Sequence, residues 1–192
     1  MSIAEQFAAE LVATKAESIP AGILDVGKAC LLDTCGVALL GCREPLVEIL
    51  SSVTTLFGGN AQASIIGRNA MASIPDAALI NGASAHALDY DDMHLASGMH
   101  PSAPVICAVL AVAQSTNASG IEFLRAVILG LETCTRLGEV MNPYHYDRGW
   151  HTTGTLGHFG AAVSSATLLG LNAAQMTVAL GLAATQSAGL KE

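Results

Sequence analysis

Two long stretches of this 192-residue sequence contain no Asp, Glu, Lys or Arg: residues 93–121 and residues 149–190. A helix on the surface of a protein needs a polar face toward water, and a helix without one must be covered on most sides. Both stretches therefore have to lie between other elements. In a chain of this length, so much apolar surface also indicates an oligomer or a partner domain.

The composition excludes several classes of protein. The chain is 52% hydrophobic and 12% charged, which is the reverse of what disorder requires. Its net charge of −8, with Lys and Arg scattered along the chain, argues against a nucleic-acid partner. No apolar run reaches about 18 residues and no signal peptide is recognisable, so we expect neither a membrane span nor secretion. Five cysteines without CxxC spacing predict reduced thiols in a cytoplasmic protein.

Apolar residues recur with helical spacing almost throughout, so the sequence predicts an all-α layered helical bundle, a single domain over residues 1–192. Capping patterns at Ser2, Ser73, Ser119 and Asn172, and Pro45 at a helix start, mark several of the boundaries. The only strand-like segment is 61–68. The expected helices span about 2–17, 23–42, 45–57, 73–88, 101 onwards, 123–140, 155–169 and 172–187.

Polar residues are concentrated in two segments between apolar helices, 85–102 and 144–154. All six histidines, the single tryptophan and all three tyrosines lie between His86 and His158. Ionisable side chains on loops of a rigid apolar scaffold are typical of a binding or catalytic pocket.

Histidine beside carboxylates suits general acid/base chemistry, because imidazole titrates near neutral pH and a carboxylate fixes its tautomer. Pro101 places His100 next to a helix start, and the segment 152–154 precedes a second expected helix. Free N–H groups at helix starts favour anions. Both loops are therefore candidates for holding a carboxylate-bearing substrate beside a histidine.

Other interpretations of these residues stay open. The acidic residues Asp89, Asp91 and Asp92 also fit a solvated turn, and Trp150 fits an anchor in the core. His86 and His158 fit satisfied core or interface histidines.

We expect no metal, because the spacings of the histidines match no known local ligand pattern. The acidic string also resembles a motif of all-α terpene cyclases, but 4% aromatic residues are too few for such a pocket.

Four motifs follow one another along the chain: GASAHALDYDD (82–92), HPS (100–102), GWHTTGTLG (149–157) and LLGL (168–171). In this order they resemble the MmgE/PrpD family, whose members include 2-methylcitrate dehydratase, cis-aconitate decarboxylase and iminodisuccinate epimerase. The likeness covers essentially the whole chain, including DTCGVA (33–38) and QSAG (186–189).

The resemblance implies a homodimer with a large helical domain and a smaller α+β lid, and metal-free, cofactor-free transfer of a proton beside a carboxylate of a di- or tricarboxylic acid. Carried over by motif, His151 is the acid/base candidate at the reacting carbon. His100 is its partner or a donor to a substrate carboxylate, and Asp89 orients or holds a proton. Met93, which stands where relatives often have a hydroxyl residue, is expected at the substrate together with Ser102 and Thr152.

Members of the family are more than twice as long, and their lid and the lysines that bind substrate carboxylates are expected beyond Glu192. The sequence therefore indicates the N-terminal helical part of a lyase, with the lid domain absent, most like 2-methylcitrate dehydratase. Two alternatives remain: an epimerase or decarboxylase of the same family, and a non-catalytic helical dimerisation or scaffold module.

Overall fold

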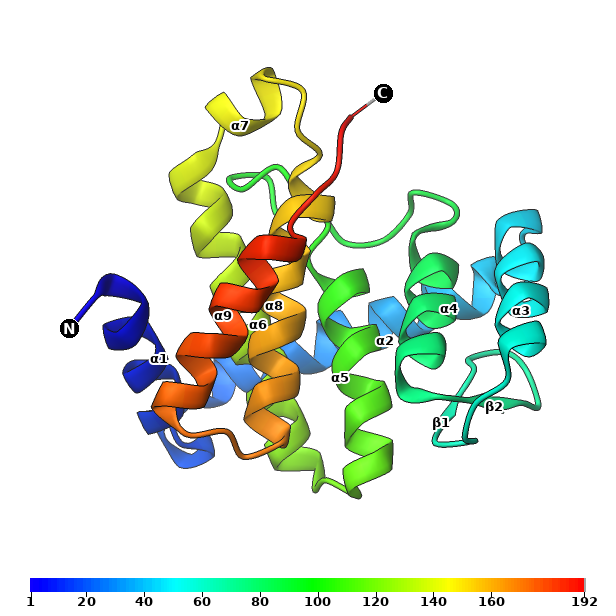
Figure 1. Cartoon of the computed structure of the whole chain (residues 1–192), viewed down its shortest axis with the longest axis horizontal. Coiled ribbons are helices and arrows are strands. Elements are labelled where there is room, and N and C mark those ends of the chain that lie inside the picture. Colours follow the sequence, from blue (N-terminus) through cyan, green and yellow to red (C-terminus); the bar gives the residue numbers. More distant parts are fainter. Residues whose placement is uncertain (192) are drawn as a thin grey trace.

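The computed structural model describes residues 1–191, and in this part of the chain nine α-helices, one 3-10 turn and a two-stranded sheet are present (Figure 1). The all-α prediction is confirmed. The elements are α1 (Ile3–Ala13), η1 (Ala16–Ser18), α2 (Ala21–Gly41), α3 (Pro45–Phe57), β1 (Ala63–Ser64), β2 (Met71–Ala72), α4 (Ile74–His86), α5 (Ser102–Thr116), α6 (Gly120–Met141), α7 (Tyr144–Asp147), α8 (Thr152–Leu168) and α9 (Ala173–Gln186).

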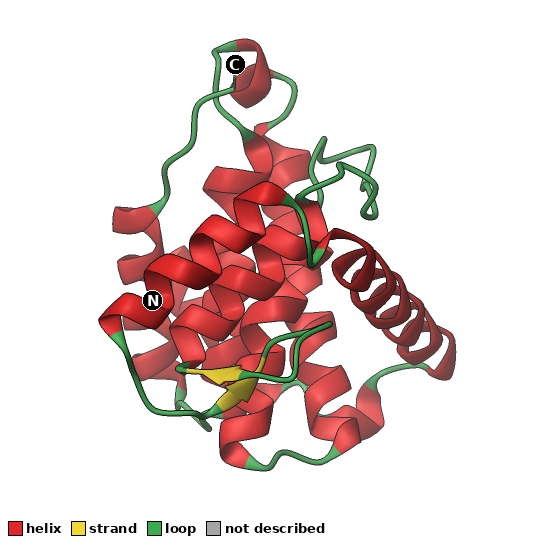
Figure 2. Cartoon of the chain, turned by 90° about the vertical axis from the view of Figure 1, so that its right-hand side faces the viewer, coloured by secondary structure: helices red, strands yellow, loops and turns green. Residues whose placement is uncertain are grey.

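Three local predictions were wrong. The first helix ends at Ala13, where Thr14 becomes extended and its carbonyl accepts a hydrogen bond from Arg125 Nε at 2.7 Å. The strand-like segment forms only one half of a hairpin, since β1 pairs antiparallel with β2. The loop expected after α6 contains the one-turn helix α7, which lies at the opposite end of the molecule from the hairpin (Figure 2).

Helices α5 and α8 form the centre of the bundle, so the prediction that the uncharged stretches are covered is confirmed for these two helices. It is wrong for α9, which lies in the second stretch and leaves Val178 62% and Leu182 63% exposed. Helix α5 packs against α4, α6 and α8, while α9 lies between α8 and α1. Helix α2 crosses behind α4, α5 and α6 (Figure 1). The fully buried side chains include Ile106 and Val109 of α5 and Leu156 and Val163 of α8.

Glycines allow α6 and α8 to approach closely. A Cβ at Gly130 would lie 2.7 Å from the carbonyl oxygen of Gly160, and a Cβ at Gly160 would lie 2.8 Å from that of Gly130. Cβ atoms essentially never lie so near another heavy atom, so only glycine fits at both positions. This crossing fixes α8 relative to the rest of the core.

Exposed apolar side chains are concentrated on α2 and α3 rather than on the uncharged central helices. Leu32 is 77% exposed and Phe57 is 86% exposed, and several other apolar residues of both helices face outward. No helix of the described residues combines the length and apolarity that a membrane crossing would need. The five cysteines are free thiols, and burial raises the pKa of Cys107 and of Cys134 to about 12.

Candidate active site

The site lies where the C-terminal end of α4 meets the N-terminal ends of α5 and α8. The backbone N–H of His100 donates to Thr153 Oγ1 at 2.9 Å, which joins the first residues of α5 and α8. After α4 the chain turns at Asp89, whose φ of 51° lies in the left-handed region that aspartate tolerates better than most residues. This turn brings the acidic loop under the two helix starts.

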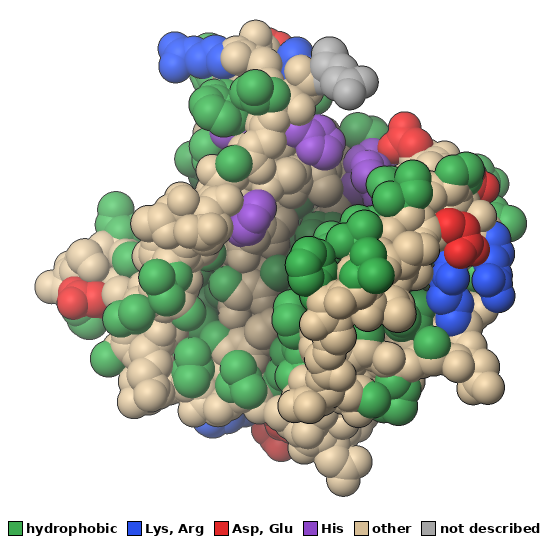
Figure 3. Space-filling view, turned by 45° about the vertical axis from the view of Figure 1, so that its right-hand side comes forward, with side chains coloured by type: hydrophobic (Ala, Val, Ile, Leu, Met, Phe, Trp, Pro, Cys, Tyr) green, Lys and Arg blue, Asp and Glu red, His purple; other side chains and the backbone are tan. Residues whose placement is uncertain are grey.

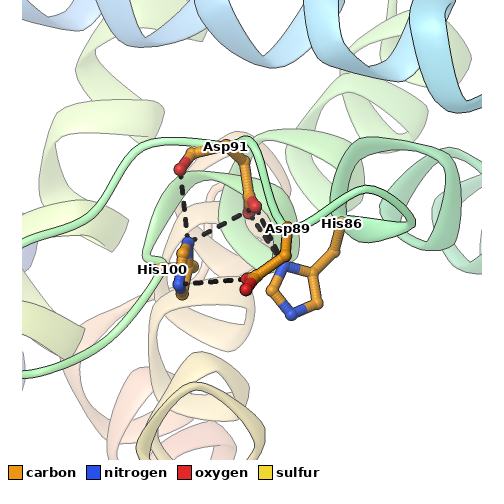
Figure 4. A group of neighbouring side chains, drawn as sticks. All are labelled: His86, Asp89, Asp91 and His100. Carbon is orange, nitrogen blue, oxygen red and sulfur yellow. Dashed lines mark hydrogen bonds and ion pairs between the residues drawn. The ribbon is translucent and has the colours of Figure 1, made fainter.

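Asp91 lies at the centre of the group. Its side chain is 0% exposed, and its carboxylate lies 2.9 Å (Oδ1) and 3.2 Å (Oδ2) from Nδ1 of His86. The same Oδ1 lies 3.3 Å from Nδ1 of His100. Figure 4 shows both rings directed at this one carboxylate, with Asp89 beside His100. Nε2 of His100 is 3.5 Å from Asp89 Oδ1, and the Asp89 side chain is 79% exposed.

His151 is the N-cap residue of α8, and its Nδ1 accepts a hydrogen bond from the backbone N–H of Gly154 at 3.3 Å. Its own N–H donates to the carbonyl of Gly189 at 3.0 Å, so the segment after α9 supports this turn. The ring centroid of His86 lies 5.0 Å from that of His100 and 6.5 Å from that of His151. Three histidines from three different segments therefore share one small volume.

These side chains border a cavity of about 590 Å³. Histidine side chains border a hollow on the face shown in Figure 3. The loop around α7 closes the other side, where Lys191 Nζ stands 3.9 Å from the centre of the Tyr146 ring. The lining residues are His86, Asp89, Met93, Leu95, Ala96, Gly98, His100, Asn142, Pro143, Tyr146, Asp147, His151 and Thr153.

The surroundings shift two of the histidine pKa values in opposite directions. The hydrogen bond to Asp91 raises the pKa of His86, helped by the nearby charge of Asp89 and opposed by burial. Burial lowers the pKa of His151, and the neighbouring His86 and His100 lower it further. Titratable pairs with pKa values pushed apart are typical of an acid and a base in one site. His86 thus favours the protonated form and His151 the neutral form.

Some of the residues predicted from the sequence line the cavity, and others are buried away from it. The cavity brings Asp89, His100 and His151 together, and Met93, 54% exposed, lies at its edge. Ser102 and Thr152 are fully buried and do not line it, so the expected substrate contact has no geometric support at either position.

Ser102 instead binds another part of the chain. Its hydroxyl donates to Asp92 Oδ2 at 2.5 Å, and its backbone N–H donates to Oδ1 of the same carboxylate at 3.3 Å. Asp92 therefore occupies the start of α5, where we expected a substrate anion, and His151 itself caps α8. Burial raises the pKa of Asp92.

The interpretation of His86 as a core histidine was wrong, because its ring borders the cavity. Its position in the last turn of α4, five residues before Asp91, is a signal that could have identified it, since a histidine at a helix end is well placed to meet the following loop. His158 is exposed on α8, and its Nδ1 donates to the carbonyl of Gly154.

Four side chains could hold a divalent ion. His86, Asp89, Asp91 and His100 each offer a ligand atom, and these atoms lie within 4.8 Å of one another. Nδ1 of His86, however, hydrogen-bonds the Asp91 carboxylate and Nδ1 of His100 hydrogen-bonds the Asp91 backbone carbonyl, so each nitrogen would have to give up its hydrogen before it could bind an ion. The arrangement fits proton transfer at least as well as metal binding, and the metal-free site stays a prediction.

The chain is similar in sequence to a known family and to several known proteins. The sequence model of the MmgE/PrpD N-terminal domain matches residues 5–192. A cis-aconitate decarboxylase-like protein of Aspergillus oryzae is 33% identical over 186 residues, 92% of this chain and 38% of that protein. Cis-aconitate decarboxylases of Aspergillus terreus and Homo sapiens are 32% and 28% identical, over 91% and 97% of this chain and 37% and 40% of their own lengths. The chain thus spans about two fifths of these relatives.

Proposed function

This chain belongs to the MmgE/PrpD family, and from that premise we propose that it supplies the histidine site of a lyase that moves a proton beside a carboxylate of a di- or tricarboxylic acid. The observation that carries the proposal is the convergence of His86, His100 and His151 on one cavity, where the pKa of His86 is raised and the pKa of His151 is lowered. General acid/base catalysis requires ionisable groups that lie within hydrogen-bond distance of the substrate, and an acid and a base in one site have different pKa values.

Among the reactions of the family, we propose decarboxylation. The sequence motifs favoured dehydration, but the relatives named above are cis-aconitate decarboxylases or similar to them. Cleavage of a carbon–carboxylate bond releases CO2 and leaves an electron pair on carbon. A proton must reach that carbon to complete the reaction. A site with at least one protonated histidine fits this demand.

We assign the roles as the motifs imply them. His151 is the acid/base group at the reacting carbon, and its neutral ring directs Nε2 to the bound molecule because Nδ1 is held by Gly154. His100 is its partner, and the exposed Asp89 carboxylate beside it holds or orients a proton. Met93 contacts the substrate at the rim of the cavity. Ser102 and Thr152 are buried behind the lining residues and pack against the site.

Binding of a polycarboxylate needs positive charge, and no Lys or Arg is among the described residues that line the cavity. A protonated His86 supplies one charge, and Lys191 lies beside the lining residue Tyr146. We propose that the lysines implied by the family resemblance supply the remainder. The activity of the whole enzyme is therefore part of this proposal.

The test is turnover of a substrate panel by the whole enzyme and by its His151→Ala variant. We expect loss of CO2 from cis-aconitate, slowed about 100-fold or more in His151→Ala, which is the usual contribution of a general acid or base. His158→Gln is the matched control on the same helix and should match the wild type, since His158 is exposed. Equal rates in His151→Ala and wild type would contradict the proposal, and turnover of 2-methylcitrate alone would favour the dehydratase reaction. Activity lost in EDTA would contradict the metal-free mechanism.

We also propose that the chain forms a homodimer, as the resemblance implies. The supporting observation is the exposed apolar surface of α2 and α3, which is costly to leave in water. Light scattering of the purified chain should give twice the chain mass, and a Leu32→Glu variant should shift it toward one chain mass. A strictly monomeric wild type would contradict this proposal and would also remove the alternative of a dimerisation module.

A further inference from the structure

We propose that Asp91 is a positioning residue that fixes the tautomers of two histidines at once, and that His86 is thereby a further catalytic residue of the site. The first half concerns geometry alone. The second half rests on the proposed function, because it assigns His86 a place in the same proton transfer.

Asp91 is buried beneath the two histidine rings. Its side chain is 0% exposed, so its oxygens depend on partners within the protein. An ionised carboxylate only accepts hydrogen bonds, and therefore both Nδ1 atoms that face it carry hydrogen. The backbone carbonyl of Asp91 lies 3.3 Å from Nδ1 of His100 as well, which favours the same tautomer of that ring.

The consequence is that Nε2 is the reactive nitrogen of both rings. A protonated His86 carries hydrogen on both nitrogens, and after Nε2 gives up its proton the neutral ring already has the tautomer that Asp91 selects. No ring flip is needed between the two protonation states. In decarboxylation, His151 would give its Nε2 proton to the carbon left by CO2 and take the Nε2 proton of protonated His86 in its place. The His86 imidazolium would become neutral imidazole, and solvent would return its proton.

His151 has the opposite arrangement. Its Nδ1 accepts from the Gly154 N–H, so the neutral ring carries its hydrogen on Nε2. A bound molecule would therefore meet a hydrogen-bond donor from His151 and two Nε2 atoms whose protonation depends on pH. The titratable groups that face His86 are Asp91, Asp89, His100 and His151, and the first of these makes the direct hydrogen bond.

Asp91→Asn separates the positioning role from a merely structural one. Both carboxylate oxygens of Asp91 lie within 3.2 Å of Nδ1 of His86, so an amide in their place would put its NH2 group, which donates, beside that nitrogen and would carry no negative charge. Histidine tautomers and protonation are measured by 15N NMR across pH. In the wild type we expect hydrogen on Nδ1 of neutral His86 and His100 and on Nε2 of neutral His151. In Asp91→Asn we expect at least one of the first two rings to change tautomer and the titration midpoint of His86 to fall.

The matched control is Asp92→Asn, because the neighbouring Asp92 carboxylate binds Ser102 and neither histidine. It should leave the tautomers of His86 and His100 unchanged. Unchanged tautomers in Asp91→Asn, or hydrogen on Nε2 of both neutral rings in the wild type, would overturn the positioning role. The wild-type tautomers decide this point even if Asp91→Asn fails to fold.

The catalytic role of His86 is tested by the pH profile of kcat. His86→Gln should lower kcat at least about tenfold and remove the loss of activity that occurs in the wild type as pH rises through the His86 titration. A kcat and pH profile equal to those of the wild type would overturn this role. If the wild type turns over no substrate, the proposed function and the catalytic role of His86 fail together, whereas the NMR result for Asp91 stands independently.

Discussion

Replacing Gly130 with alanine tests the helix crossing that holds α8, and with it His151, in place. A Cβ at this position would lie 2.7 Å from the Gly160 carbonyl oxygen, 2.7 Å from Val105 Cγ1 and 2.9 Å from Ser164 Cβ. Alanine gains about 1 kcal/mol of helix propensity over glycine. Overpacking a core costs about 1–3 kcal/mol, and the upper end applies here because a backbone carbonyl cannot rotate away.

The balance is a net destabilisation of about 2 kcal/mol, which lowers Tm by roughly 4–8 °C in a chain of this size. Calorimetry or urea unfolding measures the change. Gly36→Ala is the matched control, since Gly36 lies within α2 and no heavy atom of a neighbouring element lies within 4 Å of where its Cβ would be. That variant should gain about 0.5–1 kcal/mol. A Gly130→Ala protein that melts at or above the wild type would refute the close packing of α6 against α8.

Three further predictions concern stability. Asn172→Ala removes the capping box of α9 and should cost about 1 kcal/mol in urea unfolding; an unchanged midpoint would show that the cap contributes nothing. Because the folded pKa of His86 is raised, its charge stabilises the fold below about pH 6.5, and this is lost as pH rises through the folded pKa. The free energy of unfolding of the wild type should therefore exceed that of His86→Gln by less as pH rises over that range. A difference that grows with pH would contradict the raised pKa of His86. The raised pKa of Asp92 has the opposite consequence, because stability falls as pH rises from about 4 through the folded value. Asp92→Asn should flatten that fall, and an equally steep fall would contradict the assignment.

Local signals in the sequence predicted the helices well where both ends carry a chemical marker. Helix α3 has the expected bounds because Pro45 begins it and Gly58, with a φ of 72°, ends it. The end of α1 could not be predicted, because it depends on a hydrogen bond from Arg125 to Thr14 across 111 residues. Boundaries set by tertiary contacts leave no local pattern.

The same distinction applies to the site. The motifs pointed to Asp89, His100 and His151, which the fold brings to one cavity, although their catalytic roles remain predictions. The hydrogen bond between His86 and Asp91 and the burial of Asp91 became visible only in three dimensions, although the place of His86 at the end of α4 was a local signal for it. Ser102 lies within a matching motif but faces Asp92, so a motif alone does not tell which of its side chains face the cavity.

Deuterium incorporation is the most direct test of the claim that the histidine cavity delivers a proton to carbon beside a carboxylate. The whole enzyme would be incubated with cis-aconitate in D2O and the product followed by proton NMR. We expect one deuterium on the carbon that receives the proton in each product molecule formed, little product with His151→Ala and unchanged product with His158→Gln. Product formed by His151→Ala at the wild-type rate, or product without deuterium, would contradict the account.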